Sequence, residues 1–181
     1  MNAKRKTSRG PRVLLVVDMV NGYLDPRGSL YCGEDSRKII PFVTELIQER
    51  QGFGWPVVYL TDSHDADDPE FETYGPHCVR GTWESELIPE MPRNTHPIVR
   101  KHALSGFCNT RLGHKLQELN IHEVDVVGVC TDIGVLLTAI ELRVRGYCPR
   151  VLERGVATFQ PEMHDKALDI LRKSFKVEVQ P

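Results

Sequence analysis

The sequence lacks a long apolar run, and it also lacks a strong excess of either charge. The apolar stretch RVLLVV has only six residues before Asp18 follows it, and no window approaches the roughly 20 apolar residues that cross a bilayer. The formal net charge is −2, so the chain has no basic surplus to attract nucleic acid or an anionic membrane. We therefore expect a protein with neither a membrane nor nucleic acid as its partner.

Paired cysteines are absent as well. The five cysteines are odd in number and widely spaced, and no two of them form a CxxC motif. Such spacing favours reduced thiols in a cytoplasmic protein over a disulfide framework. The cysteines are Cys32, Cys78, Cys108, Cys130 and Cys148.

The composition is that of an ordinary soluble globular protein, with 40% hydrophobic and 27% charged residues. A chain of 181 residues is long enough to bury one core without metals or disulfides. The opening MNAKRKTSRG is basic and no apolar signal core follows it. We expect residues 1–11 to form a flexible basic tail and residues 12–181 to form a single domain.

Apolar runs alternate with segments of helical period along the chain. The runs are nearly continuous in Val, Leu and Ile, which is typical of parallel strands covered on both faces. The predicted strands are Val13–Val17, Val57–Leu60, Ile98–Arg100, Val124–Val129, Val151–Leu152 and Val177–Val179. The predicted helices cover about 35–50, 109–119, 133–145 and 162–174. This alternation predicts an α/β fold with a parallel sheet and helices on both of its faces.

Two segments, 19–33 and 62–97, break this alternation. They are rich in Gly, Pro, Asp and His, and irregular segments of such length are usually functional or disordered. In open α/β sheets the ligand lies beyond the carboxyl ends of the strands. Polar residues stand at four predicted strand ends, namely Asp18, the pair Asp62 and His64, Lys101 and Cys130. This edge of the sheet is the predicted site.

Asp18 and Lys101 suit acid–base chemistry at such an edge. A carboxylate at the mouth of a buried strand is partly desolvated, which raises its pKa towards the range useful for proton transfer. A lysine beside it can keep it ionised and can stabilise an oxyanion. Taken singly, Asp18 can equally be a turn or cap residue, and Lys101 can be a solvated surface lysine.

The segment TDSHDADDPEFETYGPHCVRGT predicts a metal site. Asp62 and His64 are two residues apart, so in extended chain their side chains point the same way. Glu70 and His77 can complete the ligand set. Two imidazoles with carboxylates suit zinc, iron or manganese. The alternative is an acidic loop that is simply solvated.

Cys130 stands in a predicted strand-to-helix turn, whose backbone N–H groups can hold an oxyanion. The alternative is a small buried apolar residue, which is how a free cysteine usually behaves.

Together these motifs resemble those of the isochorismatase-like cysteine hydrolases, and most closely those of the nicotinamidases. The resemblance runs from about Arg12 to the C-terminus. Its motifs are DMVNGY (18–23), PRGSLYC (26–32), DSH (62–64), PHCVRGT (76–82), Lys101 with SGF (105–107), GVCTD (128–132) and VLLTA (135–139).

The resemblance implies a three-layer α/β/α sandwich with a Rossmann-like, mainly parallel sheet of about six strands, and a homo-oligomer. It implies that an Asp takes the proton of a thiol, the thiolate attacks an amide carbonyl, ammonia leaves and water releases the acid. By this resemblance Asp18 is the base, Lys101 is its electrostatic partner, and the N–H groups of Cys130 and Gly134 form the oxyanion hole.

The resemblance also implies a divalent metal that orients the substrate's ring nitrogen, with the ligands Asp62, His64, His77 and Glu70. The implied substrate contacts are Tyr23, Tyr74 and Phe107.

The nucleophile position departs from the pattern. Relatives carry the cysteine at the second residue after Thr-Asp, and here that residue is Gly134, after Thr131 and Asp132. We therefore predict a nicotinamidase-like hydrolase of a small cyclic amide such as nicotinamide, with its covalent turnover crippled. Three alternatives are an isochorismatase-type vinyl-ether hydrolase that needs no thiol, a role for Cys130 as substitute nucleophile, and a non-catalytic ligand-binding homologue.

Overall fold

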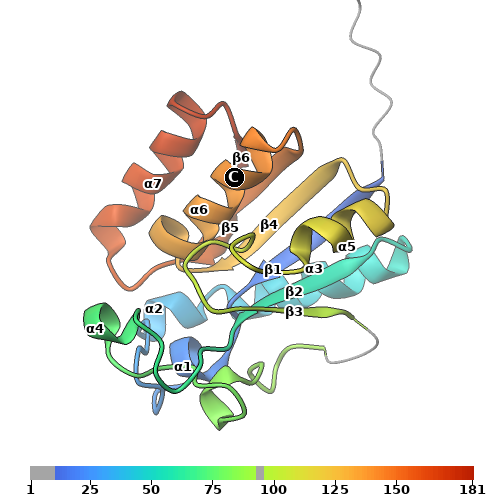
Figure 1. Ribbon diagram of the computed structural model, residues 1–181. Coiled ribbons are helices and arrows are strands. Elements are labelled where there is room, and N and C mark those ends of the chain that lie inside the picture. The colour runs from blue at the N-terminus through green and yellow to red at the C-terminus, as the bar shows by residue number, and fades with distance from the viewer. Residues whose placement is uncertain (1–10, 93–95) are drawn as a thin grey trace, which may run out of the picture.

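The computed structural model describes residues 11–92 and 96–181, and it contains a six-stranded parallel sheet (Figure 1). The strand order is β3-β2-β1-β4-β5-β6. The strands are β1 (Arg12–Val17), β2 (Val57–Asp62), β3 (Ile98–Lys101), β4 (Glu123–Val129), β5 (Cys148–Ala157) and β6 (Glu178–Gln180). The predicted α/β class and parallel sheet are confirmed. Residues 1–10 of the predicted basic tail lie outside the described residues.

Helices cover both faces of the sheet, as predicted (Figure 1). They are α1 (Asn21–Leu24), α2 (Glu34–Arg37), α3 (Ile40–Gly52), α4 (Phe71–Tyr74), α5 (Leu112–Glu118), α6 (Leu136–Val144) and α7 (Pro161–Lys173), with a 3₁₀ turn at Trp83–Ser85 and a π-helical turn at Thr131–Val135. None of these helices is both long enough and apolar enough to cross a membrane.

The core lies in two apolar layers, one on each side of the sheet. Successive residues of β1 alternate between them, so Leu14 and Val16 pack with α3 while Leu15 and Val17 pack with α5, α6 and α7. Side chains of a strand point alternately to the two faces, and a strand buried on both faces needs apolar residues throughout. The near-continuous Val and Leu of the central strands follow from this packing.

The fifth strand is much longer than predicted. It spans Cys148–Ala157, whereas the apolar run covers only Val151–Leu152. Charged residues interrupt the apolar pattern of this strand, and they are tolerated there because they are paired within the fold. The guanidinium of Arg150, for example, lies 2.7 Å from the carboxylate of the fully buried Asp125. Ion pairs of this kind let charged residues occupy a sheet position that apolar patterning does not predict.

Two predicted helices also differ in detail. The segment 35–50 is divided into α2 and α3, and the segment 133–145 begins as a π-helical turn before α6. Apart from Asp62, the last residue of β2, the described residues of the irregular segments 19–33 and 62–97 contain only the short elements α1, α4 and the 3₁₀ turn. They begin directly after β1 and at the end of β2, and α1 and α4 lie beside the carboxyl end of the sheet (Figure 1).

Glycine is required where β4 passes β1 just before the site. Gly128 has a φ of +118°, and a β-carbon there would lie 1.9 Å from the carbonyl oxygen of Val17. No side chain fits this contact, so the close approach of the two strand ends depends on Gly128.

Candidate active site and metal centre

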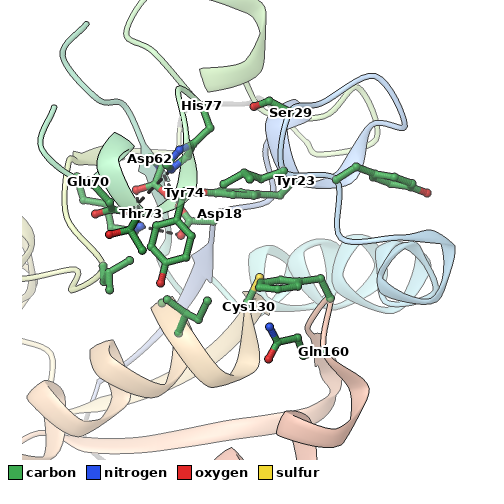
Figure 2. A pocket seen from close by; sticks show the side chains of 17 residues that line it. Asp18, Tyr23, Ser29, Asp62, Glu70, Thr73, Tyr74, His77, Cys130 and Gln160 are labelled. Atoms are coloured by element: carbon green, nitrogen blue, oxygen red, sulfur yellow. Dashed lines mark hydrogen bonds and ion pairs between the residues drawn. The ribbon is translucent and has the colours of Figure 1, made fainter. Parts of the chain in front are cut away.

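A cavity of about 530 Å³ lies at the carboxyl ends of the central strands (Figure 2). Several of the residues predicted from sequence line it. They are Asp18, Tyr23, Asp62, Glu70, Tyr74, His77, Lys101, Cys130 and Gly134. The structure thus brings together segments that are more than a hundred residues apart in the chain.

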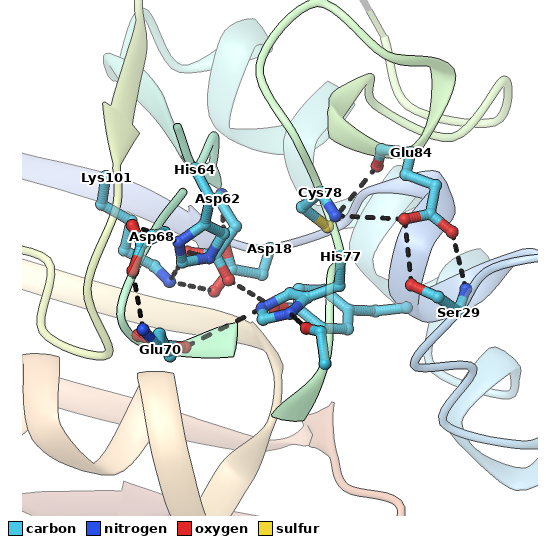
Figure 3. Close-up of polar contacts among 12 residues, drawn as sticks. Asp18, Ser29, Asp62, His64, Asp68, Glu70, His77, Cys78, Glu84 and Lys101 are labelled. Atoms are coloured by element: carbon cyan, nitrogen blue, oxygen red, sulfur yellow. Dashed lines mark hydrogen bonds and ion pairs between the residues drawn. The ribbon is translucent and has the colours of Figure 1, made fainter. Parts of the chain in front are cut away.

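Asp18 directly follows β1 and is 3% exposed. Its φ of 51° puts the backbone in the left-handed region, which is uncommon for a residue with a β-carbon. The backbone N–H of Asp62 donates to Asp18 Oδ1 at 2.8 Å, and Lys101 Nζ lies 2.8 Å from Asp18 Oδ2 (Figure 3). Both carboxylate oxygens are therefore held in fixed positions.

Lys101 is buried between two carboxylates. Its Nζ lies 2.8 Å from Asp18 Oδ2 and 2.5 Å from Asp62 Oδ1. Burial raises the pKa of Asp18 to about 7, helped by the neighbouring Asp62 and opposed by Lys101. Burial lowers the pKa of Lys101, but the two carboxylates outweigh it and raise that pKa above its ordinary value. Lys101 thus stays charged while Asp18 can exchange a proton near neutral pH.

Three buried side chains form a candidate metal centre. One ligand atom each from Asp62, His64 and His77 lies within 4.8 Å of the other two. Glu70 is nearby, with its Oε1 3.8 Å from His77 Nε2 (Figure 3). These are the four residues that the sequence motif predicts as ligands.

The two imidazoles are oriented by partners on their Nδ1 atoms. His64 Nδ1 lies 3.0 Å from an oxygen of Asp68, and His77 Nδ1 lies 2.8 Å from the carbonyl oxygen of Gly75. Metal-binding histidines usually donate one ring N–H to such an acceptor, which leaves the other nitrogen free to bind. His64 Nε2 is buried and makes no hydrogen bond among the described residues.

The charge around His64 favours a cation. Burial lowers the pKa of this imidazole, but the neighbouring carboxylates of Asp62 and Asp68 outweigh burial and raise it to about 9. The pKa of His77, by contrast, is lowered, mainly by burial. A site whose carboxylates stabilise a proton on one ring provides the same favourable field for a metal ion.

The two predicted tyrosines lie at the cavity. The hydroxyl of Tyr23 donates to Asp62 Oδ2, and its ring centroid is 6.0 Å from that of His77. Tyr74, at the end of α4, also lines the cavity (Figure 2). A flat ring entering the cavity would meet both aromatic side chains.

Phe107 is not brought to the site, contrary to the prediction. It is not among the described residues that line the cavity; it packs in the apolar layer under α5 and α6, with the guanidinium of Arg145 4.5 Å from its ring centre. The backbone explains this position. The N–H of Gly106 donates to Thr138 on α6 at 3.1 Å, and the N–H of Phe107 donates to Ser105 Oγ at 3.1 Å.

The turn at Thr131–Val135 forms another wall, to which Ile133 and Gly134 contribute. The peptide bond before Cys130 is cis. Cys130 Sγ contacts Cys32 Sγ at 3.5 Å. A β-carbon built at Gly134 would lie 3.2 Å from Asp18 Oδ2, so the position next to the predicted base carries no side chain.

Sequence reasoning missed several residues of the site. Phe159 and Gln160 line the cavity just after β5, and the true end of that strand would have indicated them. Asp68, which orients His64, stands four residues after it in the acidic run DADDPE. Gly75 acts through its carbonyl oxygen, for which a sequence carries no signal.

The fold and the site define a class of protein: an α/β enzyme with a parallel sheet and a buried Asp–Lys pair beside a candidate metal centre. The isochorismatase domain matches residues 12–180, and the chain belongs to the isochorismatase family.

Relatives within this family include named hydrolases. The chain is 34% identical over 179 residues to the uncharacterized isochorismatase family protein PncA of Bacillus subtilis (strain 168), covering 93% of this chain and 98% of that one. The crystal structure of nicotinamidase/pyrazinamidase PncA from Bacillus subtilis matches with a TM-score of 0.89 and 32% identity, over 95% of this chain and all 100% of that one. The pyrazinamidase of Pyrococcus horikoshii in complex with zinc matches with a TM-score of 0.87 and 29% identity, over 95% and 100%. The predicted resemblance to isochorismatase-like hydrolases and nicotinamidases is confirmed.

Proposed function

We propose that this hydrolase-family chain binds a small cyclic amide of the nicotinamide type beside a divalent metal, and that it hydrolyses the amide only slowly. The observation that carries the proposal is the arrangement around Gly134. The Asp–Lys pair lines the same cavity as Asp62 and His77 of the metal-ligand cluster, yet the position facing Asp18 is a glycine.

The residues present fit a metal. Asp62, His64 and His77 would hold it, with Glu70 as a further oxygen donor. His64 Nε2, which is buried without a hydrogen bond and lies 3.5 Å from Asp62 Oδ1, is accounted for if it binds an ion. This donor set suits zinc, iron or manganese, and the zinc in the related pyrazinamidase structure favours zinc. When bound, the metal supplies a Lewis-acidic coordination position for the ring nitrogen of the ligand.

The chain's own side chains would bind and orient the amide. Tyr23 and Tyr74 would contact its ring, and the charge of Lys101 would stabilise negative charge that develops near Asp18. Asp18 would take up a proton from the attacking group. With glycine at 134 the chain supplies no thiol there, so the attacking group would be water and no covalent intermediate would form.

Calorimetric titration with nicotinamide tests this proposal. The chain loaded with zinc should bind nicotinamide with a stoichiometry of about one per chain, and removal of the metal with a chelator should abolish that binding. Ammonia release by the same loaded sample should be barely above the uncatalysed rate. Absence of binding by the loaded chain, or binding that is indifferent to the metal, would contradict the proposal.

A second candidate function is supported by Asp18 itself. Its pKa of about 7 leaves a substantial fraction protonated at neutral pH, so it can donate a proton as well as accept one. Proton donation to a vinyl ether such as isochorismate needs no nucleophilic side chain at position 134. Turnover of isochorismate that disappears in Asp18→Asn would favour this function over the amide.

A further inference from the structure

Two buried thiols lie in contact beside the cavity. Cys32 Sγ and Cys130 Sγ are 3.5 Å apart, although the residues are 98 positions apart in the chain. The two cysteines are 5% and 9% exposed. A disulfide bond is about 2.05 Å long, so the two sulfur atoms need to approach by only about 1.5 Å to form one.

Cys130 is the member of the pair that can be reached. It lines the cavity, and Figure 2 shows its sulfur among the side chains that surround this space. Cys32 lies behind it, in the segment whose preceding residues Leu30 and Tyr31 also line the cavity. A small oxidant that enters the cavity therefore meets Cys130 first and finds a second thiol directly behind it.

The other three cysteines are placed differently. Cys78 is buried, and its Sγ lies 3.7 Å from the carbonyl oxygen of Glu84. Cys108 and Cys148 are exposed. Within the part of the chain that the structure describes, the contact between Cys32 and Cys130 is the only one between two thiols.

We propose that Cys32 and Cys130 form a redox-modification site, a dithiol that a hydroperoxide entering the cavity converts into a disulfide. Cys130, as its thiolate, attacks the peroxide and breaks the O–O bond, which gives a sulfenic acid and one water or alcohol. Cys32 then attacks the sulfenic sulfur, and the S–O bond breaks as the S–S bond forms and water leaves. Both thiols together lose two electrons and the peroxide gains two. A thiol reductant reverses the change.

The reaction is slow and its product is stabilising. The hydrogen bond with Cys32 and burial both raise the pKa of Cys130, so little thiolate is present and oxidation takes longer than at an exposed thiol of low pKa. The bond would close a long loop that joins the segment before α2 to the turn that begins α6. Cross-links over loops of this length raise Tm by roughly 5 °C or more in a domain of this size. None of this depends on an amide ligand or on a nucleophile at position 134.

Peptide mapping after peroxide treatment tests the site. The full chain carrying Cys108→Ser and Cys148→Ser, which removes the exposed thiols, is treated with hydrogen peroxide, alkylated and digested without reductant. We expect a peptide that joins Cys32 to Cys130, a mass loss of two hydrogen atoms and a raised Tm, all reversed by dithiothreitol. In Cys78→Ser of the same background the cross-link should form as before.

Two results would overturn the proposal. One is recovery of Cys32 and Cys130 as separately alkylated thiols after prolonged treatment that fully oxidises Cys108 and Cys148 in the unmodified chain. The other is a cross-link that involves Cys78. The variants Cys32→Ser and Cys32→Ala, either of which suffices if one fails to fold, should lose the mass change of two hydrogens and instead add oxygen at Cys130.

Discussion

Asp18 and Gly134 face each other closely enough that a side chain at position 134 would touch the Asp18 carboxylate. The β-carbon position of Gly134 lies 3.2 Å from Asp18 Oδ2, the same oxygen that Lys101 Nζ contacts at 2.8 Å. A β-carbon at this separation requires the Asp18 carboxylate to move by a few tenths of an ångström. Asp18, Lys101 and the glycine at position 134 therefore form one unit, and the proposed function depends on that unit.

Loss of one imidazole should remove the metal. His64→Ala deletes the buried Nε2 that lacks a hydrogen bond, and we expect the affinity for zinc to fall by more than about 100-fold. Metal content after dialysis, measured by mass spectrometry, checks this. His114→Ala, at an exposed position on α5, is the matched control and should keep its metal. Equal metal content in the two variants would exclude the proposed centre.

The tyrosines that line the cavity, Tyr23 and Tyr74, should determine the affinity for the ligand. Tyr23→Ala should weaken nicotinamide binding to the zinc-loaded chain by about 10-fold or more, because the ring that lines the cavity is lost. Phe107→Leu changes an aromatic side chain of the predicted set that lies outside the cavity, so it should bind nicotinamide as the unmodified chain does. Titration calorimetry measures both. A larger loss in Phe107→Leu than in Tyr23→Ala would show that the cavity is not the binding site.

Gly128 should be the glycine least able to accept a side chain. Gly128→Ala places a β-carbon 1.9 Å from the Val17 carbonyl at a φ of +118°, and we expect the free energy of unfolding to fall by about 3 kcal/mol or more. Gly52→Ala, at the end of α3 with open space around its β-carbon, should change it by less than about 1 kcal/mol. Urea unfolding gives both values. Similar stabilities for the two variants would contradict the close approach of β1 and β4.

Asp18 should act as the base once a thiol is present. In a Gly134→Cys background, Asp18→Asn keeps the size of the side chain but removes the proton acceptor, and ammonia release should fall by about 10² to 10⁴-fold. Asp165→Asn, on the exposed side of α7, should leave the rate unchanged. A rate that survives Asp18→Asn would mean that another group takes the proton.

The sequence predicted the site best where strand topology alone determines position. Asp18 and Lys101 were found because they stand at the ends of apolar strands, and parallel strands present their carboxyl ends at one edge of the sheet. The spacing of Asp62 and His64 likewise follows from the two-residue period of extended chain.

The prediction failed where tertiary contacts decide the position of a side chain. Phe107 packs against the edge of the core, in a segment tied to Thr138 on α6 by a contact between residues about thirty positions apart. Phe159 was missed because paired charges such as Glu153, which contacts Arg172 of α7, concealed the C-terminal end of β5. The contact of Cys32 with Cys130 follows from long-range packing, and their spacing gives no hint of it.

The most direct test of the account is the rate of ammonia release from nicotinamide by Gly134→Cys and by the unmodified chain, both loaded with zinc. A thiol at position 134 would adjoin Asp18 Oδ2 and restore the nucleophile that the unit lacks. We predict a rate for Gly134→Cys at least about 100-fold above that of the unmodified chain. Comparable rates for the two proteins, or no release by a Gly134→Cys variant that folds and binds zinc, would contradict the account.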